Sequence, residues 1–96
     1  MFTSAMSVKF SFLEKAGSAE ILTTLLEQKD KMYFTELKQR IGHGSMTTFA
    51  TRILELEKYG LIEFEIEKKY GRKKYIWLTE KGKKVAKHLK EIEKLM

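Results

Sequence analysis

The chain has 96 residues, of which 43% are hydrophobic and 33% are charged, and it contains no cysteine. These values predict one small globular domain over residues 1–96, and they exclude a disordered chain, disulfide bonds and zinc sites built from thiolates. No stretch approaches the roughly 18 apolar residues of a membrane span, and Met1–Phe12 lacks the apolar run of a signal peptide. We therefore expect a cytoplasmic protein that does not contact a membrane.

The positive charge lies mainly in the last third of the chain. Residues 1–67 contain 8 basic and 10 acidic side chains, a net charge of −2, whereas residues 68–96 contain 11 basic and 3 acidic side chains, a net charge of +8. Such segregation favours a polyanionic partner. A Lys-rich terminal helix is also a common way of keeping a protein soluble.

The first predicted helix follows an N-terminal extension, residues 1–15. Within this extension Val8–Leu13 alternates as a strand would, and it fits the first turn of a helix equally well. Ser18 can cap a helix from 19 to about 28 with a broad apolar face, formed by Ile21, Leu22, Leu25 and Leu26.

A short strand and a second helix come next. Asp30-Lys31 is the predicted turn, and Met32–Phe34 occupies the place of the small first strand of a winged helix. Thr35 can then cap a helix over Glu36–Ile41, whose apolar residues Leu37 and Ile41 lie one turn apart.

The third predicted helix has clear start and stop signals. Gly42-His43-Gly44 permits a sharp turn before it, because glycine adopts left-handed backbone angles without strain. Ser45 is a suitable N-cap and Gly60 a suitable C-cap, so the helix should run from about Met46 to Tyr59. One face carries an apolar stripe, formed by Phe49, Ile53 and Leu56. The opposite face carries side chains that allow close approach to a partner, namely Met46, Thr47, Ala50 and Thr51.

Two strands joined by a basic loop follow this helix. Leu61–Glu67 alternates strictly between apolar residues and glutamates, and Tyr75–Leu78 returns after the loop. A turn centred near Gly71 predicts the cross-strand pairs Ile66 with Ile76 and Phe64 with Leu78. This register places Tyr75 and Trp77 on the outer face, where we expect Trp77 to be covered by a neighbouring segment or by a second subunit.

The last predicted helix, residues 79–96, is expected to mediate dimerisation. Thr79 can cap it and Glu80 suits its first turn, whereas Gly82 is expected to weaken that turn. A narrow apolar seam along this helix is typical of packing against Val8–Leu13 or against the same helix of another chain. The residues predicted at a homodimer interface are Trp77, Val85, Leu89, Ile92 and Met96.

The order helix, turn, helix, hairpin is that of a winged helix-turn-helix. The segments that carry this resemblance are TELKQRI at 35–41, S-x-x-T-F-x-x-R-I-x-x-L-E-x-x-G-L-I at 45–62 and LTEKG at 78–82. Together they resemble the winged helix-turn-helix transcriptional regulators, most closely the MarR and HxlR types, from about Ala16 to Ile92. The resemblance implies an α+β fold, mostly α, with a three-stranded antiparallel sheet and a C-terminal helix.

The same resemblance implies a homodimeric regulator of transcription that binds specific sequences of double-stranded DNA. Helix 45–59 would lie in the major groove, and the hairpin would contact the backbone or the minor groove. Base edges and thymine methyl groups suit the side chains of Thr47, Ala50 and Thr51. Phosphates suit the N-terminus of this helix, with Ser45 and Thr48.

Charged residues limit and extend this predicted interface. Glu55 and Glu57 repel phosphate, so the later turns of the helix should stay outside the groove, and Arg52 either reaches a phosphate or pairs with a glutamate. Arg72, near the tip of the basic loop, is the candidate for minor-groove insertion, while Lys38 and Arg40 are expected to add contacts. The predicted DNA-binding residues are Ser45, Met46, Thr47, Thr48, Ala50, Thr51, Arg52, Lys68, Lys69, Arg72, Lys73 and Lys74.

Other functions have weaker support in the sequence. An enzyme is not expected, because His43 and Ser45 have no third triad member and no Gly-rich phosphate loop is present. Neither a metal nor a cofactor is predicted. The chain lacks the long extra helices that form a MarR ligand pocket. A small-molecule effector is therefore not expected, although the sequence does not exclude one. The main alternative is a winged helix that binds proteins through its Thr-rich face and Trp77, and a third is a non-specific RNA or DNA binder.

Overall fold

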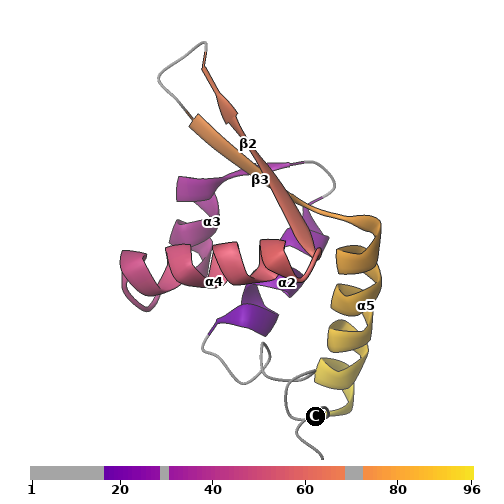
Figure 1. Ribbon diagram of the computed structural model, residues 1–96. Helices are drawn as coiled ribbons and strands as arrows, with labels where there is room; N and C mark the ends of the chain where they lie inside the picture. The colour runs from indigo at the N-terminus through magenta and orange to yellow at the C-terminus, as the bar shows by residue number, and fades with distance from the viewer. Residues whose placement is uncertain (1–16, 29–30, 69–72) are drawn as a thin grey trace, which may run out of the picture.

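The computed structural model describes residues 17–28, 31–68 and 73–96. In this part of the chain the elements are α2 (Ser18–Glu27), β1 (Met32–Tyr33), α3 (Phe34–Ile41), α4 (Met46–Lys58), β2 (Ile62–Glu67), β3 (Lys73–Leu78) and α5 (Glu80–Leu95) (Figure 1). The strands form an antiparallel sheet in the order β1-β3-β2. The predicted fold, mostly helical with a winged helix-turn-helix, is thus confirmed. The extension that contains Val8–Leu13 lies outside the described residues, as does Asp30 of the predicted turn.

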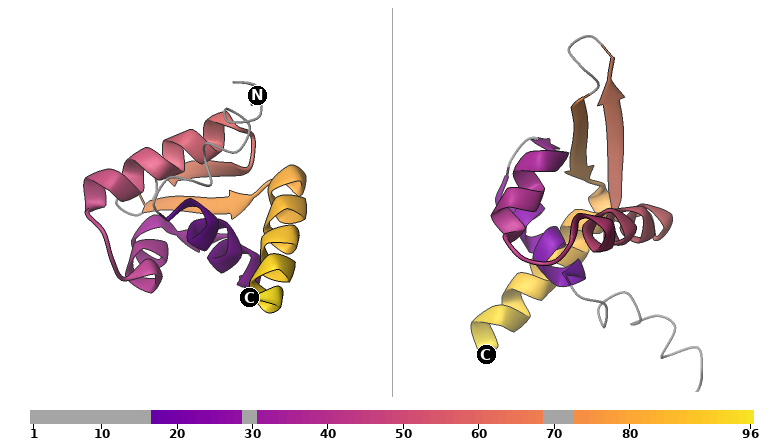
Figure 2. Two further views of the ribbon diagram at one scale, coloured as in Figure 1. Left: turned by 90° about the horizontal axis from the view of Figure 1, so that it is seen from below. Right: turned by 90° about the vertical axis from the view of Figure 1, so that its left-hand side faces the viewer.

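The helices enclose the sheet from two sides. In the view from below, α4 lies on one side of the strands and α2 and α3 lie on the other, while α5 runs beside α2 (Figure 2). The apolar stripe of α4 is buried as predicted, and so are most of the apolar residues predicted for α2 and α3. The buried core consists of Ile21, Leu22, Leu25, Met32, Leu37, Ile41, Phe49, Ile53, Leu56, Leu61, Ile62, Ile76, Leu78 and Ala86.

Two helices begin earlier than predicted. Ser18 is the first residue of α2 and is buried, so the prediction that it caps this helix was wrong; Gly17 takes that position with φ 87°. Helix α3 begins at Phe34, and Thr35 is therefore inside the helix rather than its cap. The ring of Phe34 packs edge-on against Phe49, with 4.8 Å between centroids.

The ends of α4 follow the sequence signals. The Ser45 hydroxyl oxygen accepts a hydrogen bond of 3.1 Å from the Thr48 N–H, which confirms the predicted N-cap. Gly42 and Gly44 have φ values of 73° and 81°, so the turn between α3 and α4 uses the backbone freedom that was expected of it. Gly60, with φ 76°, ends the helix.

The register of the hairpin differs from the prediction by two residues. The observed pairs are Ile62 with Leu78, Phe64 with Ile76 and Ile66 with Lys74. An even shift leaves every side chain on its predicted face. It also brings the buried Ile62, Ile76 and Leu78 together over the helices, whereas Ile66 lies on the protruding part of the hairpin and is 50% exposed.

Helix α5 begins as predicted, because the Thr79 hydroxyl accepts a hydrogen bond of 2.9 Å from the Gly82 N–H. Gly82, which was predicted to weaken this turn, is buried where the backbone of Leu61 approaches closely. Among the described helices, none combines the length and the apolar character that crossing a bilayer requires.

Candidate nucleic-acid interface

In the part of the chain that the structure describes, one face of α4 is exposed to solvent. Met46 is 51% exposed, Thr47 and Thr51 are exposed, and Ala50 is half-buried. The sequence predicted this face but missed Leu54, which is 52% exposed and continues it. Its spacing of three residues from Thr51 and seven from Thr47 was the signal that could have identified it.

Hydroxyl groups on this face are held by local hydrogen bonds. The Ser45 hydroxyl donates to the Thr48 hydroxyl oxygen over 3.0 Å, and the Thr51 hydroxyl donates to the Thr47 carbonyl over 2.9 Å. A hydroxyl that donates its proton within the protein keeps lone pairs for an incoming donor. The start of α4 therefore presents methyl groups and acceptors in fixed positions.

Arg52 takes the internal role that the sequence left open. Its guanidinium Nη1 is paired with the Glu55 carboxylate one turn along α4, and its side chain is 18% exposed. Its buried Nε has no hydrogen-bond partner among the described residues. Arg52 is therefore separated from the exposed face of α4 that carries Thr47 and Thr51.

The β2–β3 hairpin protrudes from the helical body and leans toward the end at which α4 begins (Figures 1 and 2). Lys68 and Lys73 are exposed on it. Lys74 is half-buried, with its ammonium nitrogen 4.1 Å from the centroid of the Phe64 ring. Lys69 and Arg72 lie outside the described residues.

A cluster of hydrogen bonds braces the outer face of this hairpin. The Tyr75 hydroxyl donates to the Glu67 carboxylate over 2.6 Å and lies 2.9 Å from the Tyr33 hydroxyl, and the two phenol rings stack with 4.5 Å between centroids. These hydrogen bonds, the one to Glu67 above all, raise the pKa of Tyr75. The contact between Tyr33 and Tyr75 thus links β1 to β3. The sequence alone had indicated no role for Tyr33.

The turn of the helix-turn-helix is attached to the first described helix. The His43 Nε2 atom lies 2.7 Å from a carboxylate oxygen of Glu20 in α2. The Lys38 ammonium, which was predicted to add a DNA contact, donates to the His43 carbonyl over 3.4 Å. Arg40, the other residue predicted to add a contact, is exposed.

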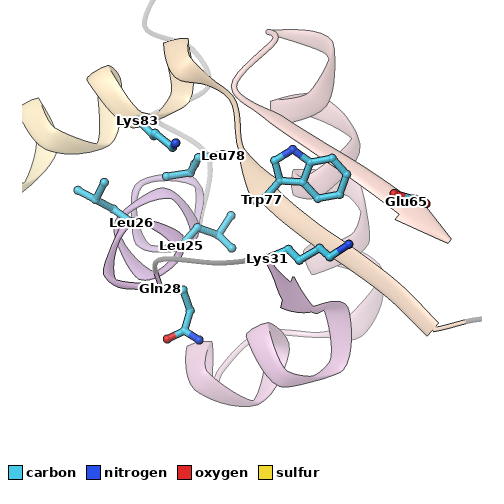
Figure 3. A pocket seen from close by; sticks show the side chains of 8 residues that line it. All are labelled: Leu25, Leu26, Gln28, Lys31, Glu65, Trp77, Leu78 and Lys83. Atoms are coloured by element: carbon cyan, nitrogen blue, oxygen red, sulfur yellow. The ribbon is translucent and has the colours of Figure 1, made fainter. Parts of the chain in front are cut away.

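The residues predicted for a dimer interface divide into three groups. Val85 and Leu89 are partly buried against the core of their own chain, whereas Ile92 and Met96 are exposed toward the end of α5, 55% and 98% respectively. Trp77 is half-buried and lines a hollow between α2, β3 and α5 (Figure 3).

This arrangement of helices and hairpin agrees with a family match. The model of the HxlR-like helix-turn-helix family matches residues 13–96. The chain belongs to the HxlR-like helix-turn-helix family. It is a helix-turn-helix transcriptional regulator of the HxlR/MarR type, a class of regulators rather than of enzymes.

Solved structures of similar proteins can be aligned with nearly the whole of this HxlR-like chain. The reduced form of the transcriptional regulator YodB from B. subtilis is 27% identical with a TM-score of 0.77, over 97% of this chain and 89% of that one. A possible HxlR family transcriptional factor from Thermoplasma volcanium GSS1 is 26% identical with a TM-score of 0.81, over 98% and 82%.

A third structure supports the fold alone. A MarR family protein from Porphyromonas gingivalis W83 is 19% identical with a TM-score of 0.83, over 98% of this chain and 90% of that one. Among curated protein sequences, none matches this chain significantly.

Proposed function

We propose that the chain binds specific sequences of double-stranded DNA as a homodimer and thereby regulates transcription. Helix α4 lies in the major groove with its first two turns, and the hairpin contacts the phosphate backbone or the minor groove. Thr47, Ala50 and Thr51 contact base edges and thymine methyl groups, while Ser45 and Thr48 contact phosphate.

The observation that carries this proposal is the open face of α4. In a protein with 33% charged residues, the solvent-exposed face of a helix would ordinarily carry lysines and glutamates. Here Met46, Thr47, Ala50 and Thr51 occupy it, and short side chains allow a helix to enter a groove. The hairpin leans toward the same end of α4, so one duplex can contact both elements (Figure 1).

Electrostatics supports the contact from the hairpin side. Lys68 and Lys73 are exposed beside a loop whose sequence adds Lys69 and Arg72. Each ammonium or guanidinium that neutralises a phosphate releases a counterion, which makes binding depend steeply on salt. We assign Arg52 to internal pairing with Glu55 and remove it from the set of proposed DNA contacts.

The exposed end of α5 supports a homodimer. Ile92, Leu95 and Met96 are exposed on the last turns, and an apolar surface of this kind is stabilised when a second copy covers it. Within the dimer, the two α4 helices should lie about 34 Å apart, one turn of DNA. Trp77 remains a proposed member of the interface.

The experiment is a titration of the protein with random duplexes and with duplexes enriched by selection, at about 50 mM and about 200 mM salt. The proposal expects the selected duplexes to bind about a thousandfold more tightly than random ones. It also expects a loss on the order of a thousandfold in affinity at the higher salt if six or more phosphates are contacted.

Two other results would overturn the proposal in different ways. Equal binding to all duplexes with the same steep salt dependence would identify a non-specific nucleic-acid binder. Weak binding with a shallow salt dependence would identify a winged helix that contacts proteins instead.

A further inference from the structure

We propose that Lys74 is a positioning residue that holds the hairpin in place relative to α4, rather than a contact to phosphate. This inference rests on the proposed function, because it concerns how the two elements of the DNA-binding surface are kept together. The sequence predicted Lys74 as a DNA contact, together with Lys68 and Lys73. The structure gives Lys74 different surroundings: it is half-buried, whereas the other two lysines are exposed.

Lys74 lies where the hairpin leaves the helical body. The backbone pairs between β1 and β3 end at Tyr33 with Tyr75, so Lys74 is the first residue of β3 beyond them toward the tip. Its partner across the hairpin is Ile66, which is 50% exposed. A hairpin of two strands is only marginally stable by itself, so side-chain contacts with the body are needed to keep the protruding part in one direction (Figure 1).

The Lys74 ammonium makes such a contact because it lies close to two aromatic rings. Its nitrogen is 4.1 Å from the ring centroid of Phe64, on the neighbouring strand β2, and 5.1 Å from that of Phe34, at the start of α3. Both distances are within the roughly 6 Å over which a cation is attracted to the face of a ring. A single side chain of β3 thus bridges the hairpin and α3.

Phe34 extends this bridge to α4. Its ring packs edge-on against Phe49, with 4.8 Å between centroids, and Phe49 is 5% exposed. Phe49 belongs to the buried face of α4, whereas Thr47 and Thr51 lie on the exposed face. A continuous series of side-chain contacts therefore joins β3, through α3, to the helix that is proposed to enter the major groove.

The two rings compete with a phosphate for the Lys74 ammonium. To reach a phosphate, this ammonium would have to leave both Phe64 and Phe34. Lys73 lies on the opposite face of β3, because side chains alternate along a strand, and it is exposed, as is Lys68. Phosphate contact therefore falls to Lys68 and Lys73, and positioning falls to Lys74.

One experiment measures the affinity of the full chain for a duplex enriched by selection, as a function of salt. Lys74→Met keeps an aliphatic stem and removes the charge. It should weaken binding by about two- to fivefold and leave the slope of log affinity against log salt unchanged. Lys74→Arg keeps a cation that can lie over both rings and should stay within about twofold of the parent. Lys68→Met makes the same change at an exposed lysine that follows β2, and should reduce the slope by about 0.9.

A second measurement, hydrogen exchange of the backbone amides, does not depend on DNA. In the free chain, Lys74→Met should raise the exchange rates of residues 65–67, in the outer half of β2, by about two- to fivefold. Lys74→Arg should restore the parent rates. The amide of Ile62, at the buried base of the hairpin, should be unaffected, and Lys68→Met should leave all these rates unchanged.

Three outcomes would overturn the inference. Lys74→Met could reduce the salt slope as much as Lys68→Met does, which would make Lys74 a phosphate contact. Lys74→Arg could lose as much affinity as Lys74→Met, which would show that a cation over the rings is not the cause. The amides of residues 65–67 could also exchange at the parent rate in Lys74→Met. Failure of the parent chain to prefer the selected duplex would contradict the proposed function instead, and the exchange rates would still decide the role of Lys74.

Discussion

Gly82, in the first turn of α5, lies directly against the backbone carbonyl of Leu61. A Cβ on Gly82 would lie 2.9 Å from the Leu61 carbonyl carbon and closer still to its oxygen. The same carbonyl accepts a hydrogen bond of 3.1 Å from the Thr79 N–H. The start of α5 is thereby fixed to the segment that joins α4 to β2.

Replacing Gly82 by alanine should therefore destabilise the protein. Alanine favours helix by up to about 1 kcal/mol over glycine, but the clash is with backbone, which cannot rotate away as a side chain can. We expect a net loss of about 1–3 kcal/mol in the free energy of unfolding, measured with urea. Lys84→Ala, at an exposed position of the same helix, is the control and should be nearly neutral. A Gly82→Ala variant as stable as the parent would contradict this account.

The Thr79 side chain should contribute through two hydrogen bonds. Its hydroxyl accepts from the Gly82 N–H over 2.9 Å and donates to the Gly60 carbonyl over 2.6 Å. Thr79→Ala should lower the free energy of unfolding by about 0.5–2 kcal/mol, as loss of an N-cap usually does. Thr79→Ser keeps the hydroxyl and should stay close to the parent. Equal losses in the two variants would point to the methyl group instead.

The ion pair between Glu27 and Lys90 should make stability depend on pH. The Lys90 ammonium donates to the Glu27 carboxylate over 2.5 Å, which links α2 to α5. This hydrogen bond and the positive charge lower the pKa of Glu27 from its ordinary value of 4.5, and they raise the pKa of Lys90. A lowered carboxyl pKa stabilises the fold above pH 4.5, and this contribution is lost as the pH falls through the folded-state pKa.

Unfolding experiments can isolate this contribution. Glu27→Gln should lose stability at neutral pH and converge with the parent as the pH falls below 4.5. Glu57→Gln removes the same charge from an exposed position of α4 and serves as the comparison. A gap between parent and Glu27→Gln that stays constant down to low pH would show that the carboxylate charge is not its source.

The tyrosine cluster should be visible in an alkaline titration. Glu67 accepts a hydrogen bond from the Tyr75 hydroxyl and Tyr33 adds a second hydrogen bond, so the pKa of Tyr75 is raised above its ordinary value of 10.0. The neutral phenol stabilises the fold below pH 10, and that contribution is lost as the pH rises through the folded-state pKa.

Ultraviolet absorbance of phenolate is the appropriate measurement. Tyr75→Phe should remove a late-ionising phenol, whereas Tyr33→Phe keeps the hydrogen bond between Tyr75 and Glu67 and should retain that phenol. Should Tyr75→Phe leave the late phase in place, the assignment of the cluster would be wrong.

Variants at the proposed interface should separate positioning from base recognition. Lys73→Gln should weaken binding to every duplex and reduce the salt slope by about one. Thr51→Ala should change which duplexes are preferred, because the proposed contact of Thr51 is to a base. Lys94→Gln makes the same charge change at the end of α5 and is the control. A uniform loss from Thr51→Ala on all duplexes would argue against base contacts.

The sequence by itself determined the elements whose causes are local. Ser45 and Thr79 cap their helices through hydrogen bonds that span three residues, and the spacing of Phe49, Ile53 and Leu56 made one face of α4 apolar. The exposed face of α4, which is the part of the candidate site that lies on this helix, followed from the same spacing. A helix repeats every 3.6 residues, so the position of one buried face fixes the position of the exposed face.

Only the tertiary structure decided how these elements meet. The hairpin register shifted by two residues because burial of Ile62 against the helices outweighed the burial expected for Ile66. Arg52 was paired internally, and the hollow beside Trp77 was formed by residues from α2, β3 and α5. Such contacts join residues far apart in sequence or depend on competing partners, so no local sequence pattern specifies them. A helix cap or an apolar helical stripe, in contrast, depends only on residues that are close in sequence.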